Sequence, residues 1–273
     1  MHGTATEIGM ACAVLLLVIS AGMGLSAKDG EEPSGEATGV LLKPIPDKLV
    51  VLTFDDACAS HATFVAPLLK KYGFGATFYI CEFGKNFSNK TFYMSWEQIR
   101  ALDEMGFEIG NHTLSHPGLG GKSLDVCKAE LKAIEDRCLK HQITKPTTFC
   151  WPGYSLNTAL YPVLAEKGYL FARGGGERPY VPTTDNRFNT PSFAVHDKSL
   201  AKKDSFANAA KQATGGRVVI FTFHGAPDLE HKWVNTEPAR FEECMAYLKE
   251  NNYTVLAMRD LARYGDASKA PSK

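Results

Sequence analysis

An apolar run of the chain ends abruptly in two acidic residues, since residues 50–56 read Val-Val-Leu-Thr-Phe-Asp-Asp. The part from Leu49 to Leu52 has no polar alternation, which is typical of a strand buried on both faces of a sheet. Asp55 and Asp56 therefore follow the point where that strand leaves the sheet. Successive strand residues face opposite sides, so the backbone must turn there if both carboxylates serve one site. Adjacent like charges beside an apolar core are costly without a cation or a proton, so the stretch predicts a functional site.

The rest of the chain alternates short apolar runs with amphipathic stretches. Eight strand-like runs cover residues 49–53, 76–80, 108–110, 147–151, 170–173, 189–193, 218–223 and 254–257. Helical stretches follow most of them, at residues 61–72, 95–105, 123–141, 157–167, 201–213 and 241–251. This alternation predicts parallel strands covered by helices. The expected fold is a distorted (β/α) barrel of seven or eight parallel strands in a single α/β domain.

Composition sets limits on the class of protein. The chain has 273 residues, of which 44% are hydrophobic and 22% charged, so one domain can bury a large core. Lys and Arg total 30, as do Asp and Glu, which gives a formal net charge of zero. A neutral chain has no electrostatic reason to bind nucleic acid or an anionic membrane, so the sequence predicts neither partner. The sequence does not determine the oligomeric state.

The first residues differ from the rest. Residues 10–25 carry no charge and are rich in Leu, Val, Ala and Gly, but the run is short for a membrane span. The pattern predicts a secretory signal peptide at residues 1–27, cleaved near Ala27, and hence a secreted, periplasmic or cell-surface protein without a transmembrane span when mature. No Lys or Arg precedes the run, so an uncleaved anchor or a misassigned start remains an alternative. We expect a flexible leader at 28–46, the catalytic domain at 47–264 and a disordered tail at 265–273.

In a barrel of this kind, catalytic groups lie just past the carboxyl ends of the strands. Chemically useful residues do follow the predicted strands: Asp55 and Asp56 after the first, His112 and His116 after the third, Trp151, Gly153 and Tyr154 after the fourth, Arg173 after the fifth, and His224 after the seventh. The sequence thus predicts one site at this rim.

Each feature alone has an ordinary explanation. An Asp pair often caps a helix or sits in a turn, and two histidines four apart often just make core hydrogen bonds. Together, one carboxylate and two imidazoles are the ligands of zinc or another divalent transition metal, with positions left for water. The second carboxylate is then free to act as a base, and His224 as an acid.

Three segments carry a family resemblance. Residues 53–56 (Thr-Phe-Asp-Asp), 112–117 (His-Thr-Leu-Ser-His-Pro) and 221–224 (Phe-Thr-Phe-His) resemble the first, second and fifth motifs of the polysaccharide deacetylase superfamily, carbohydrate esterase family four. The resemblance covers about residues 48–264 and implies a distorted barrel. It also implies roles for five residues: Asp55 as general base, Asp56, His112 and His116 as metal ligands, and His224 as general acid.

The resemblance further implies a cofactor and a substrate class. The metal would be Zn²⁺, with Co²⁺, Ni²⁺ and Mn²⁺ as alternatives, and the substrate an N-acetylated glycan such as chitin or peptidoglycan. A backbone N–H of Gly153 or Tyr154 would stabilise the oxyanion, and His224 would protonate the leaving nitrogen. The other candidate substrate contacts are Trp151 and Arg173.

Two departures from the family pattern stand out. The third motif often has an arginine that orients the base, but residues 149–154 read Phe-Cys-Trp-Pro-Gly-Tyr and place Cys150 there. Arg173 at the next strand end either supplies that charge or is an ordinary surface residue. The acid of the fourth motif, which tunes the catalytic histidine, is also unclear; the unranked candidates are Glu177, Asp185 and Asp197.

Some alternatives stay open at this point. The aromatic residues Trp151, Tyr154, Phe193 and Trp233 either stack on sugar rings or belong to the core. The enzyme could hydrolyse a small cyclic amide or an O-acetyl ester instead of a glycan amide. Because Cys150 replaces the arginine, a carbohydrate-binding barrel that has lost catalysis is a third alternative.

Overall fold

The computed structural model describes residues 41–266 of the chain. The predicted signal peptide and residues 28–40 of the predicted leader lie outside the described residues, as do residues 267–273 of the predicted tail. Those boundaries therefore stay predictions. Within residues 41–266, no helix has both the length and the apolar character needed to cross a membrane.

Eight parallel strands form one curled sheet, which confirms the predicted fold class. They are β1 (Leu49–Phe54), β2 (Thr77–Ile80), β3 (Glu108–Asn111), β4 (Thr148–Cys150), β5 (Phe171–Arg173), β6 (Phe193–Ala194), β7 (Val219–Phe223) and β8 (Thr254–Leu256). Their order is β5-β4-β3-β2-β1-β7-β6, and β8 pairs with β1. Each predicted run contains a strand, although the sixth begins four residues later than expected.

Strand β1 lies at the centre of the sheet. It pairs with β7 along one edge, while its other edge pairs first with β8 and then with β2. Its six residues are all fully buried, as the unbroken apolar run predicted. Burying each Val, Leu or Phe side chain stabilises the fold by roughly 1.5–3 kcal/mol. Strand β1 therefore holds the residues that follow it in a fixed place.

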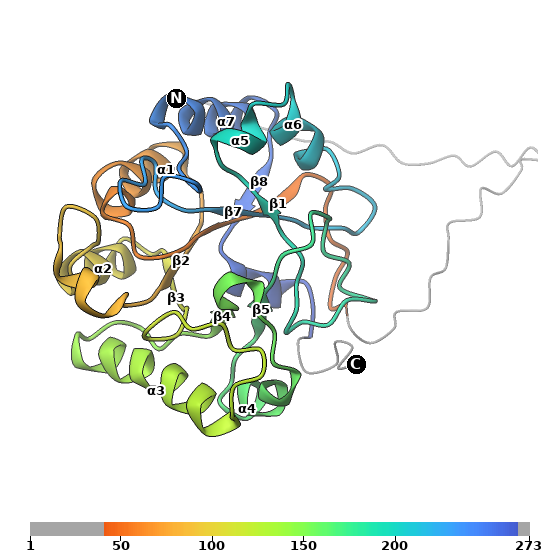
Figure 1. Cartoon of the computed structure of the whole chain (residues 1–273). Helices are drawn as coiled ribbons and strands as arrows, with labels where there is room; N and C mark the ends of the chain where they lie inside the picture. Colours follow the sequence, from red (N-terminus) through yellow and green to blue (C-terminus); the bar gives the residue numbers. More distant parts are fainter. Residues whose placement is uncertain (1–40, 267–273) are drawn as a thin grey trace, which may run out of the picture. The chain divides into compact units, whose positions relative to one another are not determined.

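Helices cover the outside of the sheet, and Figure 1 shows α1 to α4 around it. The α-helices are α1 (Ala66–Tyr72), α2 (Trp96–Glu104), α3 (Leu124–Lys140), α4 (Tyr161–Glu166), α5 (Asp197–Leu200), α6 (Ser205–Ala210) and α7 (Pro238–Glu250). Short helices of other types are η1 (His61–Val65), η2 (Gly84–Ser88), η3 (Pro152–Tyr154), η4 (Thr158–Leu160) and η5 (Met258–Arg263). The helix predicted at 201–213 is shorter than expected, because Asp204 has a φ of 57° and caps helix α6, which covers only Ser205–Ala210.

The barrel is open between β5 and β6. The described residues show no ladder between these strands, and residues 174–192 contain neither a helix nor a strand. A single bridge joins Arg173 to Thr190. The fold is thus a half-barrel, which is the distortion expected from the long loops.

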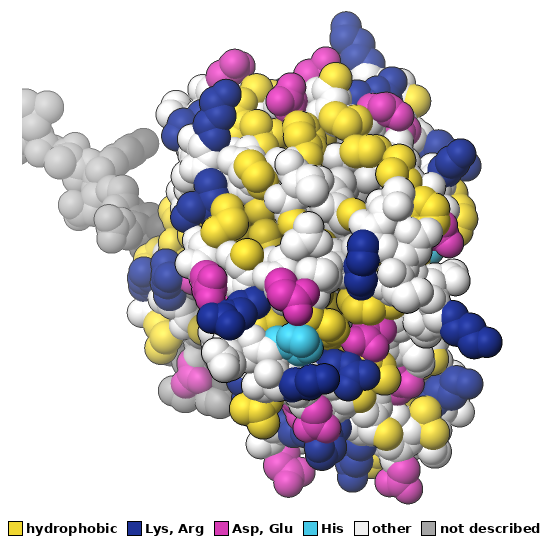
Figure 2. Space-filling model, turned by 90° about the vertical axis from the view of Figure 1, so that its left-hand side faces the viewer, with side chains coloured by type: hydrophobic (Ala, Val, Ile, Leu, Met, Phe, Trp, Pro, Cys, Tyr) yellow, Lys and Arg dark blue, Asp and Glu magenta, His cyan; other side chains and the backbone are white. Residues whose placement is uncertain are grey.

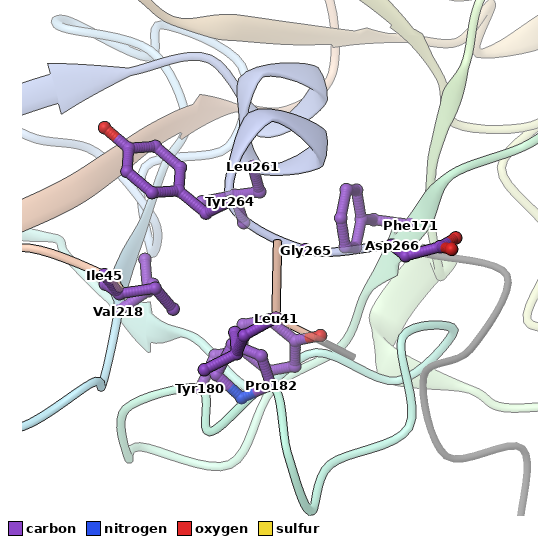
Figure 3. Close-up of a pocket in the computed structure, with 10 residues that line it drawn as sticks. All are labelled: Leu41, Ile45, Phe171, Tyr180, Pro182, Val218, Leu261, Tyr264, Gly265 and Asp266. Atoms are coloured by element: carbon purple, nitrogen blue, oxygen red, sulfur yellow. The ribbon is translucent and has the colours of Figure 1, made fainter. Parts of the chain in front are cut away.

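The amino ends of the strands are closed by apolar packing. Leu41 bridges to Gly265, and Figure 3 shows both with Phe171, Tyr180 and other residues around a small cavity. Its volume is about 20 Å³, which is room for roughly one water molecule. This end of the sheet cannot hold a substrate.

Charges are interspersed on the surface. Figure 2 shows one face on which Lys and Arg side chains alternate with Asp and Glu, without a large area of a single sign. The mixed charges on this face agree with the neutral composition of the chain.

Candidate metal centre and active site

A cavity of about 480 Å³ lies at the carboxyl ends of the strands. That volume is in the usual range for ligand sites. The structure brings nearly all the predicted site residues to its wall: Asp55, Asp56, His112, His116, Trp151, Gly153, Tyr154 and His224. Only Arg173, among the predicted site residues, does not line it.

The backbone turns sharply after β1. Asp55 continues the ladder, since its N–H donates to the Phe223 carbonyl at 2.9 Å, but Asp56 and Ala57 have φ values of 74° and 52°. These left-handed conformations are unusual for residues other than glycine. They bring both carboxylates to the same cavity, as one site requires.

Asp56, His112 and His116 form a compact cluster of potential ligands. The Asp56 Oδ1 atom lies 3.4 Å from His112 Nε2 and 3.5 Å from His116 Nε2. The other nitrogen of His112, Nδ1, lies 2.9 Å from the Cys150 carbonyl oxygen. A carbonyl can only accept, so Nδ1 carries a proton, and Nε2 is the ring nitrogen that would bind a metal after losing its proton. Three donor atoms facing one another in this way fit a divalent cation.

The protonation states support this fit. Burial, together with the nearby His112, lowers the pKa of His116 to about 4, so that the imidazole is neutral and able to ligate at neutral pH. Burial alone would raise the pKa of Asp56, but the hydrogen bond from His112 and the nearby imidazoles hold it well below its usual range. Burial likewise opposes a charge on His112, yet Cys150 and Asp55 raise its pKa above the usual value. A metal would therefore displace a proton from this cluster.

A second set of donors lies beneath the first. Asp55, His112 and Cys150 also converge, with the Cys150 sulfur 3.7 Å from Asp55 Oδ2 and 3.9 Å from His112 Nε2. The guanidinium of Arg173 occupies this place, because its Nη2 hydrogen-bonds to Asp55 Oδ2 and lies 2.7 Å from the Cys150 sulfur. A fixed positive charge there opposes a cation, so the Asp56 set is the candidate metal site.

Arg173 is fully buried, so its interpretation as a surface residue is wrong. Cys150 and Arg173 are cross-strand partners in the register of β4 and β5. Neighbouring partners of this kind point to the same side of a sheet. The charge that is missing from position 150 thus comes from the adjacent strand, and it lies under the cavity rather than among the expected substrate contacts.

Asp55 is held as an anion. Burial raises the pKa of its carboxyl group, but the Arg173 guanidinium together with His112 and His224 outweighs burial and keeps the pKa below its ordinary value of 3.8. Its Oδ2 contacts Arg173, whereas its buried Oδ1 has no hydrogen-bond partner among the described residues. An ionised carboxylate with a free acceptor is suited to take a proton.

His224 follows β7 and faces the same carboxylates. Its Nε2 lies 3.7 Å from Asp56 Oδ2, and its carbonyl oxygen is 3.1 Å from the Nε2 of the buried His61. The imidazole is therefore placed at the cavity and its backbone is fixed from below.

The sequence profile of the polysaccharide deacetylase family matches residues 43–172. These residues run from before β1 to β5 and contain Asp55, Asp56 and both histidines of the cluster. This part of the chain belongs to the polysaccharide deacetylase family.

Two curated relatives of the chain come from Bacillus species. A peptidoglycan-N-acetylglucosamine deacetylase of Bacillus cereus is 28% identical over 140 residues, which cover 50% of this chain and 61% of the relative. A second curated relative, from Bacillus subtilis, is matched over only 35% of its length. The chain thus spans about a third to three fifths of the curated relatives.

Two solved structures show the same fold. A family 4 carbohydrate esterase of Bacillus subtilis superposes with a TM-score of 0.51 at 19% identity, over 83% of this chain and 86% of the other. A family 4 pseudoenzyme of Bacillus anthracis does so with a TM-score of 0.55 at 16% identity, over 80% and 66%. The fold thus occurs both in esterases and in a pseudoenzyme.

The three sequence candidates for the acid of the family's fourth motif make contacts elsewhere. Glu177 accepts from the Ala194 N–H at 3.0 Å, and Asp185 pairs with Arg178 at 2.7 Å. Asp197 accepts from the Glu237 N–H at 3.0 Å. These hydrogen bonds and ion pairs hold loops together and involve no atom of the proposed acid.

Sequence reasoning missed two histidines that line the cavity, His196 and His231. His231, in the loop after β7, places its Nδ1 3.7 Å from Asp228 Oδ2 and 3.9 Å from Asp56 Oδ2. The adjacent Asp228 carboxylate raises the pKa of His231. The sequence did contain a signal for this site. Asp228 and His231 are three residues apart and follow soon after the strand-terminal His224.

The predicted aromatic residues divide into two groups. Trp151 is fully buried and donates its indole N–H to the Phe188 carbonyl at 2.8 Å, and Phe193 is buried and does not line the cavity. Tyr154 and Trp233 line the cavity and are exposed. Only these two fit a stacking role.

Proposed function

We propose that the protein is a metal-dependent hydrolase that removes N-acetyl groups from a glycan. The observation that carries the proposal is the Asp56–His112–His116 cluster beside the Asp55 carboxylate, at the floor of an open cavity. A divalent metal held there, with Zn²⁺ the first choice and Co²⁺, Ni²⁺ or Mn²⁺ as alternatives, would supply Lewis acidity that lowers the pKa of water and polarises a carbonyl.

The residues of the chain divide the proton transfers between them. Asp55, ionised and held by Arg173, takes the proton of the attacking water. His224, on the other side of Asp56, donates a proton to the leaving nitrogen. The Tyr154 N–H donates to the Trp151 carbonyl at 3.0 Å, so of the two predicted oxyanion donors we assign the role to the Gly153 N–H.

Arg173 also bears on the alternative of a binding protein without turnover. That alternative arose because Cys150 stands where the family often has an arginine. Since Arg173 places a guanidinium on Asp55 from β5, the base keeps its partner and turnover is favoured.

We also propose that the protein acts outside the cytoplasm. The support is the uncharged run at residues 10–25 followed by small residues. Release of a shortened chain into the medium or periplasm, with a new terminus near Lys28, would support export.

The function is tested by acetate release. Metal-loaded protein should release acetate from N-acetylglucosamine oligomers faster than from O-acetyl esters or small cyclic amides. If loaded protein releases no acetate from any N-acetylated glycan, the proposal fails; preferential turnover of esters or cyclic amides would instead establish the second enzymatic alternative.

A further inference from the structure

The segment that follows the two carboxylates is tied to the segment that follows β7. Three side-chain contacts join residues 58–61 to residues 224–228. In chain order they run from Cys58 Sγ to Asp228 Oδ2 at 3.3 Å, from Ser60 Oγ to the Ala226 nitrogen at 3.0 Å, and from His61 Nε2 to the His224 carbonyl oxygen at 3.1 Å. All three side chains of the first segment are buried. The contacts pair the two segments in opposite directions, so they hold them along their length.

The outer two contacts have defined donors. Burial raises the pKa of the Cys58 thiol, which therefore keeps the proton that it donates to Asp228. Burial lowers the pKa of His61 to about 4, so its ring carries a single proton at neutral pH. Because a carbonyl can only accept, that proton lies on Nε2 and is donated to His224.

The surroundings of His61 would otherwise suit a phenylalanine. Its ring packs against Phe54 and Phe78, with centroid distances of 5.6 Å and 5.3 Å. Its other ring nitrogen, Nδ1, is buried and has no hydrogen-bond partner among the described residues. An unsatisfied polar atom in an apolar core is destabilising. What the imidazole adds to an apolar ring at this place is the hydrogen bond to the His224 carbonyl.

The local backbone brings His61 to this place. Asp56 and Ala57 are left-handed, and the His61 N–H then donates to the Cys58 carbonyl at 3.0 Å, which makes a compact turn. His61 begins the π-helix η1, a rare form that occurs frequently at functional sites.

His224 depends on its backbone for its position. Its Nε2 is 3.7 Å from Asp56 Oδ2, which is longer than a normal hydrogen bond. The next residue is in a tight turn, because a Cβ at Gly225 would lie 2.6 Å from the Asp228 Cα atom. This turn couples the backbone at His224 to Asp228, the residue that Cys58 holds.

We infer that Ser60 and His61 are positioning residues that hold His224 in place relative to Asp55 and Asp56. The inference rests on the proposed function, in which Asp55 is the base and His224 the acid. These two groups follow neighbouring strands, β1 and β7, and their proton transfers need a fixed separation. A misplacement of about 1 Å can slow an enzyme roughly 100-fold.

Variants of the two residues test this role. His61→Phe keeps the aromatic packing but removes the donor, so kcat should fall by about tenfold to 100-fold while KM and bound metal stay unchanged. His61→Gln restores an N–H and should recover kcat to within about threefold of wild type. Ser60→Ala should lower kcat by about threefold to tenfold. Thr63→Ala, exposed on the same helix, is the matched control and should change nothing.

A double-mutant cycle separates positioning from a merely structural role. In a chain that already carries His224→Ala, adding His61→Phe should lower kcat by less than about twofold, because the effect of His61 passes through His224. An equal loss in both backgrounds would overturn the inference.

Amide hydrogen exchange of the metal-free protein, followed by NMR, gives a readout that needs no turnover. The Ala226 N–H should exchange at least about tenfold faster in Ser60→Ala and in His61→Phe than in wild type or Thr63→Ala. Unchanged exchange in both variants would overturn the inference.

The two proposals fail separately. If the wild-type chain releases acetate and both His61→Phe and Ser60→Ala keep full kcat, this inference is wrong and the hydrolase function stands. If the wild-type chain releases no acetate from any acetylated glycan while Ala226 exchanges faster in both variants, the function is wrong and the hold of Ser60 and His61 on the His224 loop stands.

Discussion

Two buried carboxylates of the same sheet, Glu108 and Asp55, have opposite surroundings. Glu108 starts β3 at the closed end, and both of its oxygens accept hydrogen bonds: from Thr77 at 2.6 Å, from Thr148 at 2.8 Å and from the Arg259 N–H at 2.8 Å. Asp55 follows β1 at the open end, and one of its two oxygens has no partner among the described residues. Both oxygens of Glu108 thus have hydrogen-bond partners within the fold, whereas one oxygen of Asp55 remains free to accept a hydrogen bond from a ligand.

Left-handed backbone conformations occur at both ends of the sheet. Asp56, Thr113, His116 and Tyr154 have positive φ values at the open end, while Lys48 and Asn252 have them before β1 and β8 at the closed end. Such conformations cost energy for residues other than glycine. Only at the open end do they accompany the unpaired Asp55 oxygen and the cavity.

The largest expected effect is that of Asp55→Asn. The amide keeps an oxygen that can accept from Arg173 but cannot serve as a base, so kcat should fall by about 10²–10⁴-fold. Metal content should be unchanged, because the candidate ligands are untouched. Acetate-release kinetics with metal analysis check this; a variant that kept more than a tenth of wild-type kcat would remove Asp55 from the mechanism.

A similar loss should follow His224→Ala. Without the acid, kcat should fall by about 10²–10⁴-fold while metal stoichiometry stays the same. His141→Ala is the control, since that ring stacks on Trp96 outside the cavity. If His224 only stabilises the strand end, the variant should instead melt earlier and retain its turnover per folded molecule.

Arg173→Ala should affect both stability and activity. Removing one partner of a buried ion pair typically costs about 3–5 kcal/mol, and Asp55 would lose its orientation as well. Arg178→Ala, which breaks an exposed pair with Asp185, should change stability by at most about 1 kcal/mol. Denaturant unfolding of both variants, with kcat of the folded fraction, measures the difference; equal effects would contradict a special role for Arg173.

Glu108→Gln should lower stability by a smaller amount, about 1–3 kcal/mol, because some of its acceptors are lost. Activity per folded molecule should not change.

Burial raises the pKa of Glu108 above its ordinary 4.5, so the folded state binds this proton more tightly than the unfolded chain. Its contribution to stability therefore falls as pH rises above about 4.5, and the deficit of the variant should shrink over that window. Melting curves between about pH 4 and pH 7 check the sign; a deficit that grows with pH would show that Glu108 is stabilising as an anion.

The strand pattern and the candidate metal cluster could be predicted from sequence because both rest on local signals. The apolar run before Asp55 identifies β1, and the spacing of His112 and His116 identifies two candidate ligands that follow a single strand. The role of Arg173 could not be decided, since it depends on which residue faces Cys150 across two strands. That register is fixed by packing and leaves no mark in either segment.

The positions of several loop residues also could not be predicted from the sequence. Asp228, His231 and Asn235 have no periodicity, and their places are set by side-chain hydrogen bonds to one another and to Asp197. Asp204 shortens a predicted helix for a different reason: its backbone is left-handed, and Asp tolerates that conformation.

Metal stoichiometry tests the central claim most directly. Purified wild-type protein, Asp56→Asn and Glu108→Gln would each be dialysed against Zn²⁺ and analysed for bound metal. We predict about one metal per wild-type chain, one per Glu108→Gln chain and little or none in Asp56→Asn, with all three folded by circular dichroism. Full metal content in folded Asp56→Asn, or none in the wild type, would contradict the assignment of this site.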